Sequence, residues 1–372
     1  MTVMVCIPCL LTGGTEVQTL SLVEALVAAG HKPVVACYFE YAEAMVRRFR
    51  EAGADVRLMS EDGKRPKGIK ATAAHLWKGL RRIIRDCRPN AAHVQYMAPG
   101  ALPILILRAL GVRTIIATAH TAADIYSETG LRVIRFLSRT CLTAFQCITE
   151  RAERGFFGAS HRFDGTLSRH FTIYNNLPGH ISIRREPRAE LTESQPITVG
   201  VVSRLELIKG MDIVVPAFAK AAKSNDRLRL LVVGDGTLRS FMARQASEYG
   251  ITDRVDLEGR KTQSELQDYY DRIDILLMPS RSEGFGLTAI EGMARGCVTI
   301  AAEVGGLPEV VTPDCGLLHI PEDADDLAAK ISELSANPQR ISSLSSGAIR
   351  RAEVFSTFNY REAITSLYNC LK

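Results

Sequence analysis

Short runs of apolar, often β-branched residues alternate with amphipathic segments of helical length along almost the whole chain. The first cycle places the run Val3–Ile7 before a helix expected over Glu16–Ala29, and the same order is repeated several times. Strands that alternate with helices of this length pair in parallel, and the helices cover both faces of the sheet. The chain is therefore predicted to be an α/β protein with doubly wound sheets.

One interruption of this alternation predicts the domain division. The residues from His180 to Pro196 are polar, charged and proline-bearing, as in a linker, and a second strand–helix series begins at Ile197. The chain has 372 residues, which is too long for one ordinary core. We expect two Rossmann-like domains that face each other across a cleft, one over residues 1–185 and one over residues 186–356.

The two halves of the chain differ in charge. Residues 1–190 carry 26 Lys and Arg against 16 Asp and Glu, whereas the remainder carries 20 against 25. A basic half favours an anionic partner. Its basic residues are densest where apolar residues recur at helical spacing, with Lys78, Arg81 and Arg82 close to Trp77. Two interpretations stay open, a helix on an anionic membrane surface or a domain helix with a solvated basic face. A nucleic acid partner is not expected, because no aromatic stacking platform accompanies the charge.

The sequence also bears on location and on the thiols. The N-terminal MTVMVCIPCL lacks the charged region and cleavage site of a signal peptide. No apolar run reaches the roughly 18 residues that a membrane span needs, and the longest, Ala98–Val112, contains Pro103 and Arg108. We therefore expect a cytoplasmic protein. Peripheral contact with the inner face of the membrane is compatible with this location. Cys6 and Cys9 form a lone C-x-x-C, with no second pair to complete a zinc site, and are expected to be reduced thiols.

Ligands of doubly wound sheets bind at the carboxyl ends of the strands, so polar residues in the loops there are candidate ligand-binding residues. Gly13-Gly14 lies between the first strand and its helix, where the backbone is able to approach an anion closely. Arg204 and Lys209 follow the strand that begins at Ile197, and two cations there suit a diphosphate. Taken alone, the first of these loops is more typical of a tight turn and the second of a solvated loop. Gly234-Asp235-Gly236 lacks the third glycine of a dinucleotide loop and is interpreted as a sharp turn.

The most informative loop has the sequence MPSRSEGFGL and precedes a predicted helix. Gly284 and Gly286 free the backbone, so that N–H groups from Phe285 onwards face an anion or a sugar hydroxyl. Glu283 lies on the loop and Glu291 in the second helical turn, so their carboxylates need not be adjacent. This disfavours a glycosidase-type acid/base pair. It favours two separate hydroxyl-binding roles along an extended ligand.

In this order along the chain, these motifs resemble those of the retaining glycosyltransferases of family 4, which have the GT-B fold. The resemblance rests on Arg204 and Lys209, on Glu283-Gly284-Phe285-Gly286 with Glu291, on Gly305-Gly306-Leu307-Pro308-Glu309, on GGTE at 13–16 and on His120 at a strand end. It spans nearly the whole chain. Asn176 stands where the family commonly has glycine, and Val298-Thr299 where it commonly has Pro-Val. Neither change removes a polar ligand of the expected site.

The resemblance implies a role for each of these residues. Arg204 and Lys209 would hold the donor diphosphate, Glu283 would contact the transferred sugar, and Glu291 would contact the ribose hydroxyls. His120 would lie near the donor sugar. The further donor-binding residues that it implies are Gly13, Gly14, Gly259, Arg260, Lys261, Gly284, Phe285, Gly286 and Leu287, and the expected catalytic set is His120, Arg204, Lys209 and Glu283. The C-terminal helix, residues 357–372, is expected to pack back onto the first domain.

The expected activity is transfer of a sugar, with anomeric retention, from a nucleotide diphosphate sugar to a hydroxyl of a saccharide or lipid-linked acceptor. UDP is favoured over GDP, and a role in lipopolysaccharide, other cell-surface polysaccharide or glycolipid synthesis is expected. Cations and a helix N-terminus would stabilise the leaving diphosphate, so neither a metal nor a cofactor is expected. The alternatives are a non-catalytic nucleotide-sugar-binding or scaffold protein and a same-fold nucleotide-sugar epimerase. A Rossmann oxidoreductase is disfavoured, because G-x-G-x-x-G is lacking.

Overall fold

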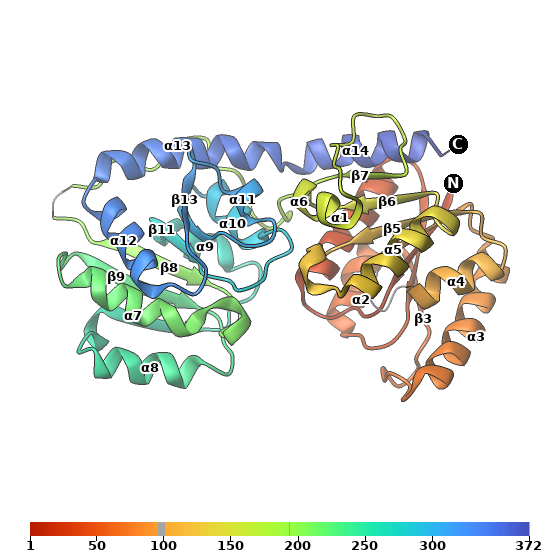
Figure 1. The fold of residues 1–372 in the computed structure, drawn as a ribbon, viewed down its shortest axis with the longest axis horizontal. Helices are drawn as coiled ribbons and strands as arrows, with labels where there is room; N and C mark the ends of the chain where they lie inside the picture. The colour runs from red at the N-terminus through yellow and green to blue at the C-terminus, as the bar shows by residue number, and fades with distance from the viewer. Residues whose placement is uncertain (96–100, 193, 372) are drawn as a thin grey trace. The chain divides into compact units, whose positions relative to one another are not determined.

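The computed structural model describes residues 1–95, 101–192 and 194–371 (Figure 1). The chain forms two compact units: unit 1 is Met1–Asn176 with Thr357–Lys372, and unit 2 is Leu177–Ser356. The division thus lies after Asn176 rather than after residue 185, and the C-terminal helix belongs to unit 1. The start of the apolar run Ala98–Val112 lies outside the described residues.

Unit 1 is built on a seven-stranded parallel sheet of order β3-β2-β1-β4-β5-β6-β7. Its strands are β1 (Thr2–Ile7), β2 (Lys32–Cys37), β3 (Asp55–Leu58), β4 (Ala91–Gln95), β5 (Thr114–Ala119), β6 (Ala144–Cys147) and β7 (His170–Thr172). The central strands are buried on both faces, as parallel strands covered by helices should be. This confirms the predicted α/β class.

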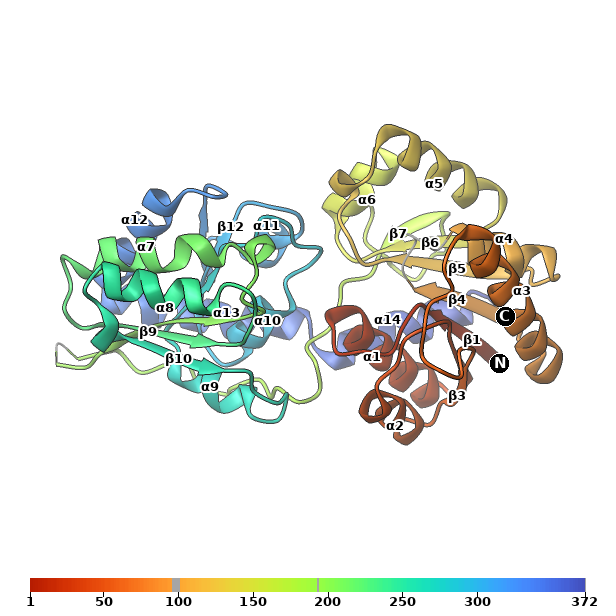
Figure 2. The same cartoon turned by 90° about the horizontal axis from the view of Figure 1, so that it is seen from below.

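Helices cover both faces of this sheet (Figure 2). One face carries α1 (Gly14–Ala28), α2 (Glu43–Glu51) and the C-terminal α14 (Thr357–Asn369), whose Ile364, Leu367 and Tyr368 are buried in the same core. The other face carries α3 (Ile69–Cys87), α4 (Ala101–Ala109), α5 (Glu128–Thr140) and α6 (Glu150–Phe157), with the short turn η1 (Ala123–Ile125). Among the described residues, no helix combines the length and the apolarity needed to cross a membrane.

Unit 2 repeats the design on a six-stranded parallel sheet of order β10-β9-β8-β11-β12-β13. Its strands are β8 (Ile197–Val202), β9 (Leu228–Val233), β10 (Val255–Gly259), β11 (Ile275–Met278), β12 (Val298–Ala302) and β13 (Gly316–His319). Its helices are α7 (Met211–Ala222), α8 (Arg239–Glu248), α9 (Leu266–Arg272), α10 (Leu287–Ala294), α11 (Leu307–Val310), α12 (Ala324–Ser335) and α13 (Pro338–Val354), with the turns η2 (Leu207–Lys209) and η3 (Thr252–Arg254).

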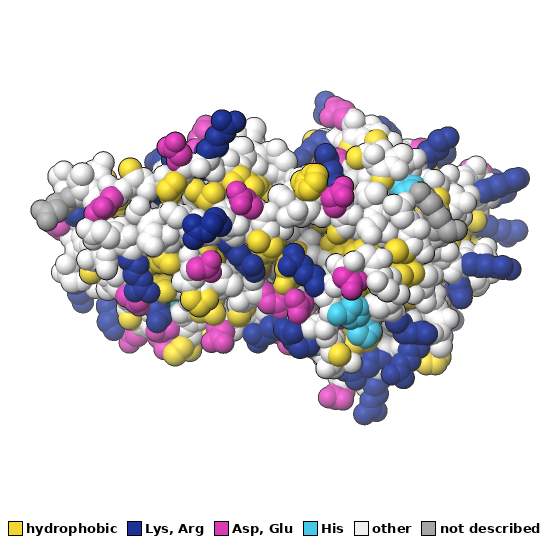
Figure 3. All heavy atoms as spheres, turned by 90° about the horizontal axis from the view of Figure 1, so that it is seen from above, with side chains coloured by type: hydrophobic (Ala, Val, Ile, Leu, Met, Phe, Trp, Pro, Cys, Tyr) yellow, Lys and Arg dark blue, Asp and Glu magenta, His cyan; other side chains and the backbone are white. Residues whose placement is uncertain are grey.

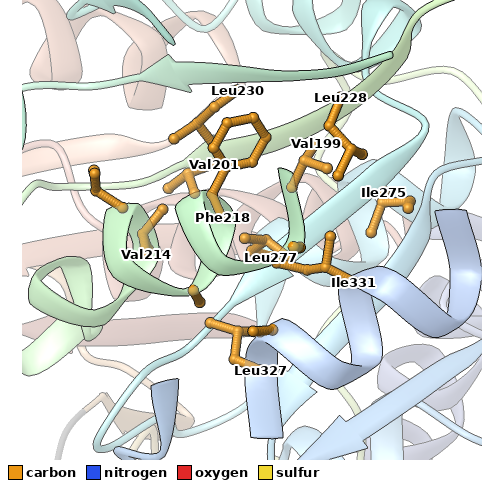
Figure 4. Close-up of a cluster of buried hydrophobic side chains, with 14 of the residues drawn as sticks. Val199, Val201, Val214, Phe218, Leu228, Leu230, Ile275, Leu277, Leu327 and Ile331 are labelled. Carbon is orange, nitrogen blue, oxygen red and sulfur yellow. The ribbon is translucent and has the colours of Figure 1, made fainter. Parts of the chain in front are cut away.

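The core of unit 2 lies between its sheet and helices α7 and α12 (Figure 4). Side chains two residues apart on a strand share a face, which places Val199 and Val201 of β8 in the same layer. Phe218 of α7 and Ile331 of α12 are both fully buried in this layer. The packed layer fixes β8 and β11, and with them the loops that leave their carboxyl ends.

The segment from His180 to Pro196 is not the free linker that its composition suggests, although Glu193 lies outside the described residues. Arg188 donates from Nε to the carbonyl of Gly296 (3.2 Å) and from Nη1 to the carbonyl of Asp271 (3.0 Å). Its side chain is only 10% exposed, and Nη1 lies 3.4 Å from Asp274 Oδ1. A buried guanidinium that is satisfied in this way ties the segment to unit 2, which a count of polar residues does not show.

The packed layer gives a first prediction. Phe218→Ala removes a fully buried ring and leaves a cavity, which should cost about 3–5 kcal/mol of stability. The measurement is the thermal unfolding midpoint of unit 2 by calorimetry. The control Tyr249→Ala in the same unit removes a ring that is 50% exposed and should lower the midpoint much less. Equal losses in the two variants would contradict the assigned core.

Candidate functional site

A pocket lies at the carboxyl ends of β8 and β11 in unit 2. Its empty space is about 240 Å³ when the part that is open to solvent is included. Val202 and Ser203 contribute to it from the end of β8, Lys209 from the turn that follows, and Ser280 and Glu283 from the loop after β11. This is the edge of the sheet at which doubly wound domains bind ligands.

A lysine and a glutamate meet in this pocket. Lys209 Nζ lies 2.6 Å from Glu283 Oε2, and Ser280 Oγ donates to the same oxygen at 3.4 Å. The two charged side chains are only 22% and 16% exposed. The attraction within an ion pair that is shielded from water is stronger than that within a surface pair, because less solvent screens the two charges. The pocket therefore offers a cation for a phosphate oxygen beside a carboxylate that accepts hydrogen bonds from hydroxyls.

Arg281 joins the two loops that carry this pair. Its Nη1 and Nη2 donate to Asp212 Oδ1 (2.7 Å) and Oδ2 (2.9 Å), at the start of α7, and its Nη1 also donates to the carbonyl of Leu207. Its Nε donates to Glu322 Oε2 at 2.8 Å. The guanidinium holds the pKa of the Asp212 carboxyl below its ordinary value, so the pair stays ionised at neutral pH. The sequence analysis did not single out Arg281 or Asp212, because 69 residues separate them.

Two glycines allow these loops to come this close. Gly210 has φ +69°, and a Cβ there would lie 1.9 Å from the carbonyl oxygen of Pro279. Gly305 has φ +50°, and a Cβ there would lie 1.8 Å from the carbonyl oxygen of Glu283, which also accepts from the N–H of Gly306 at 3.1 Å. The Gly305-Gly306 motif therefore supports the backbone of Glu283 directly.

The glycine-rich loop leads into α10 as predicted. Gly286 precedes the helix with φ +106°, and Leu287 is its first residue. Gly284 is half-buried beside them. The Phe285 ring is buried and meets the Phe355 ring edge-on at 5.4 Å between centroids, so this residue has only its backbone to offer a ligand.

Glu291 lies apart from the Lys209–Glu283 pair, in α10. Its Oε2 accepts from the Tyr270 hydroxyl at 2.6 Å, and its Oε1 lies 3.8 Å from His180 Nε2. Burial raises the pKa of Glu291 to about 7, against the opposing effect of the Tyr270 hydrogen bond. Its carboxyl therefore changes charge close to neutral pH. Glu283 and Glu291 thus contact different side chains.

The remaining predicted residues of unit 2 lie at the same edge of the sheet but are not among the described residues that line the pocket. Arg204 is exposed. Gly259 ends β10 with φ +73°. Arg260 is exposed, whereas Lys261 Nζ pairs with Glu258 Oε2 at 3.0 Å. Of the two predicted diphosphate cations, the structure brings Lys209 alone to Glu283.

Unit 1 holds the other predicted residues, at the ends of β1 and β5. Gly13 precedes α1, and a Cβ there would lie 2.6 Å from Glu16 Oε2, whereas Gly14 is the first residue of the helix. His120 follows β5, and its Nε2 lies 2.8 Å from Gln95 Oε1. Burial lowers the pKa of His120 to about 4, so its ring is neutral at physiological pH. All nine cysteines are free, as predicted for Cys6 and Cys9.

Two family models match the chain: a glycosyl transferase 4-like domain over residues 13–150 and glycosyl transferases group 1 over residues 182–351. The D-inositol 3-phosphate glycosyltransferase of Rhodococcus opacus is 30% identical over 310 residues, which are 75% of this chain and 67% of the relative. This chain belongs to the group 1 glycosyl transferases. The enzyme of the same name from Thermobispora bispora is 38% identical over 164 residues, 41% of this chain. The chain thus spans 38% to 67% of the length of these two relatives.

Solved structures show the fold of this group 1 chain. The crystal structure of Anabaena HepE in complex with UDP superimposes with a TM-score of 0.80 at 17% identity. The match covers 99% of this chain and 100% of HepE. The predicted GT-B fold is therefore confirmed.

The buried carboxyl of Glu291 gives a second prediction. Its folded-state pKa of about 7 lies above its ordinary value of 4.5, so the folded protein keeps a proton that the unfolded chain releases. This contribution to stability is fully present below pH 4.5 and is lost as the pH rises to about 7. Between pH 4.5 and about pH 7, the free energy of unfolding should therefore fall less in Glu291→Gln than in the wild type. The difference between the two falls should be on the order of 3 kcal/mol.

The measurement is the denaturant unfolding of both proteins between pH 4.5 and pH 8. Glu248→Gln is the matched control, because the Glu248 side chain is 63% exposed and its exchange should not change the slope. Equal pH slopes for the wild type and Glu291→Gln would show that the buried carboxyl is ionised throughout.

Proposed function

We propose that this chain transfers a sugar from a nucleoside diphosphate sugar to a hydroxyl of an acceptor, with retention at the anomeric carbon. The observation that carries the proposal is the Lys209–Glu283 pair in the pocket at the ends of β8 and β11. Membership in the group 1 glycosyl transferases supports the reaction class. HepE, which has the same fold, was crystallised with UDP, and this favours UDP over GDP as the nucleotide.

The chemistry follows from where charge develops. As the glycosidic bond to phosphate breaks, negative charge grows on the leaving diphosphate, and a fixed cation at that point lowers the barrier. Lys209 supplies this cation, assisted by the backbone N–H groups at the start of α10, and Arg204 adds positive charge at the same sheet edge. Glu283 accepts a hydrogen bond from the transferred sugar. The departing phosphate oxygen takes the acceptor proton, so this path uses no metal and no cofactor.

The other predicted donor-binding residues also have roles in this proposal. Glu291 as a carboxylate accepts from the ribose hydroxyls, and the backbone near Gly259, Arg260 and Lys261 meets the base. His120 is neutral, and the oxygen of Gln95 accepts from its Nε2, so Nδ1 is left as a hydrogen-bond acceptor for the donor sugar. Gly13 and Gly14 let the backbone approach the diphosphate.

The proposed acceptor is anionic or lipid-linked. The support for this acceptor class is the set of exposed side chains on one face of unit 1. Helices α3 and α5 lie on the same face of its sheet. Each exposes apolar residues, Ile69 (79%) and Trp77 (42%) on α3 and Phe136 (64%) on α5. Exposed arginines flank them, including Arg81 and Arg82. Figure 3 shows many Lys and Arg side chains on the surface of unit 1. Exposed aromatic residues among basic ones are typical of proteins that bind anionic membrane surfaces.

The donor site is tested by removing its cation. Lys209→Ala should lower kcat/KM for the sugar donor on the order of 100-fold, because a preorganised charge at the leaving group is lost. Release of the nucleoside diphosphate measures turnover, and the anomeric proton signal of the product reports retention. Lys220→Ala, at a lysine that is 57% exposed in the same unit, should leave turnover unchanged. Full activity in Lys209→Ala, or loss of wild-type activity in EDTA, would contradict the proposed mechanism.

The membrane part is tested by sedimentation with vesicles. The wild type should bind vesicles of anionic phospholipid at low salt and be released as salt rises, because surface charges are screened. Reversal of two charges in Arg81→Glu/Arg82→Glu should weaken binding at least about 10-fold, since each basic residue contributes about 1 kcal/mol. The matched variant Lys220→Glu/Arg244→Glu in unit 2 should bind as the wild type does. Equal binding to neutral vesicles would remove membrane contact from the proposal.

A further inference from the structure

A buried carboxylate lies on α6 of unit 1, whereas the pocket with Lys209 and Glu283 belongs to unit 2. Glu153 is fully buried, and its Oε2 accepts from the Thr172 hydroxyl at 2.7 Å and from the N–H of His161 at 3.2 Å. These two donors occupy Oε2 and fix the plane of the carboxylate. Its Oε1 instead faces two imidazole rings, with His170 Nδ1 at 2.6 Å and His161 Nδ1 at 3.4 Å.

This carboxylate needs a positive partner. A buried ionised carboxylate is costly unless a cation balances it. Among the residues that the structure describes, the basic groups in contact with Glu153 are His161 and His170, with no lysine or arginine. The three donor atoms lie within 4.8 Å of one another. The balancing charge must therefore be a proton on an imidazole or an ion held between the rings and Oε1.

The hydrogen bonds of Ser168 show how His161 is able to offer a lone pair to such an ion. Ser168 has one hydroxyl hydrogen, which it donates to the carbonyl of His170 at 2.7 Å. Its oxygen also contacts His161 Nε2, and it is able only to accept there, so Nε2 carries a proton. In a neutral ring, the lone pair of His161 then lies on Nδ1 and faces Glu153 Oε1. Two lone pairs in this arrangement repel each other unless a cation lies between them.

We propose that Glu153 Oε1, His161 Nδ1 and His170 Nδ1 bind a divalent metal ion of the zinc type. Imidazole nitrogen and carboxylate oxygen are donors that zinc accepts, with water as the fourth ligand. His161 and His170 are 45% and 24% exposed, which leaves this position open to solvent. Ser168 and Thr172 hold the outer sides of the ligands, as the partners of metal-bound residues commonly do.

The observed spacing is close to what such an ion requires. Ligand atoms about 2.0–2.1 Å from a tetrahedral zinc ion lie about 3.3 Å apart. The separation of His161 Nδ1 from Glu153 Oε1 is 3.4 Å, and that of His170 Nδ1 is 2.6 Å. The His170 ring therefore has to withdraw by about 0.7 Å. It is stacked on the Phe157 ring at 4.3 Å with the planes 7° apart, so it moves this far within its plane and keeps the stacking contact.

A metal ion at this place would fix one segment of the chain. Glu153 lies on α6, whereas His161 lies in the connection from α6 to the edge strand β7 and His170 is the first residue of that strand. The ion would join all three and hold residues 158–169 against the sheet edge. It would be structural and separate from the donor pocket, which lies in unit 2.

The first test is metal binding by the complete, tag-free and chelator-treated protein. Calorimetric titration with Zn²⁺ should show one tight site per chain. Co²⁺ at that site should give visible ligand-field bands without a thiolate charge-transfer band, because no ligand is a cysteine. His161→Ala should weaken Zn²⁺ binding at least about 100-fold, and Glu153→Gln should do the same while keeping most hydrogen bonds. His75→Ala, at a half-buried histidine elsewhere in unit 1, should bind Zn²⁺ as the wild type does.

The second test measures the segment itself. Zn²⁺ should slow tryptic cleavage after the exposed Arg162 several-fold in the wild type and not in His161→Ala. The binding of UDP should be unaffected by Zn²⁺ and by His161→Ala, which keeps this proposal separate from the donor site. Equal Zn²⁺ affinity in the wild type and His161→Ala, a thiolate band with Co²⁺, or no uptake of Zn²⁺ would overturn it. The cluster would then be a protonated histidine–carboxylate group.

Discussion

The two-point ion pair between Arg281 and Asp212 is the contact on which the site in unit 2 depends. Parallel strands bring their carboxyl ends to one edge, but they leave the loops there free to diverge. Arg281 removes this freedom, because its guanidinium binds both oxygens of Asp212 and also the carbonyl of Leu207. Lys209 and Glu283, 74 residues apart in sequence, are thereby held 2.6 Å apart. The packed layer beneath them keeps the strands themselves in place.

The two units use one architecture for different surfaces. Unit 2 places a shielded pair of opposite charges in a small pocket, where the proposed donor would meet a cation with its diphosphate and a carboxylate with its sugar. Unit 1 presents exposed arginines and aromatic side chains on helices α3 and α5, and it buries Glu153 under two histidines. Most of the basic residues of unit 1 are exposed, and the proposed contact with an anionic surface relies on those of α3 and α5.

Much of this was predictable from local sequence, and the remainder depends on long-range contacts. Apolar runs and glycines report on nearby backbone, so the strands, the loop before α10 and the lone C-x-x-C were interpreted correctly. Lys209 and Glu283 each lie in a loop at the end of a predicted strand, and the ordered family motifs distinguish them from residues of solvated loops. Arg281 gave no such signal, because its partner is distant in sequence. Composition was misleading for the segment around Arg188, since the guanidinium of this residue is buried rather than solvated. The Glu153 cluster has no short motif at all.

The most direct test of the account is a double-mutant cycle on UDP affinity, measured by titration calorimetry. The variants are Lys209→Ala, Arg281→Gln and the two combined. If Arg281 acts by holding the loop of Lys209 in place, its loss should weaken UDP binding strongly in the wild type and only slightly once Lys209 is absent. Additive losses would show that the two residues act independently. Unchanged affinity in Lys209→Ala would show that the nucleotide binds elsewhere.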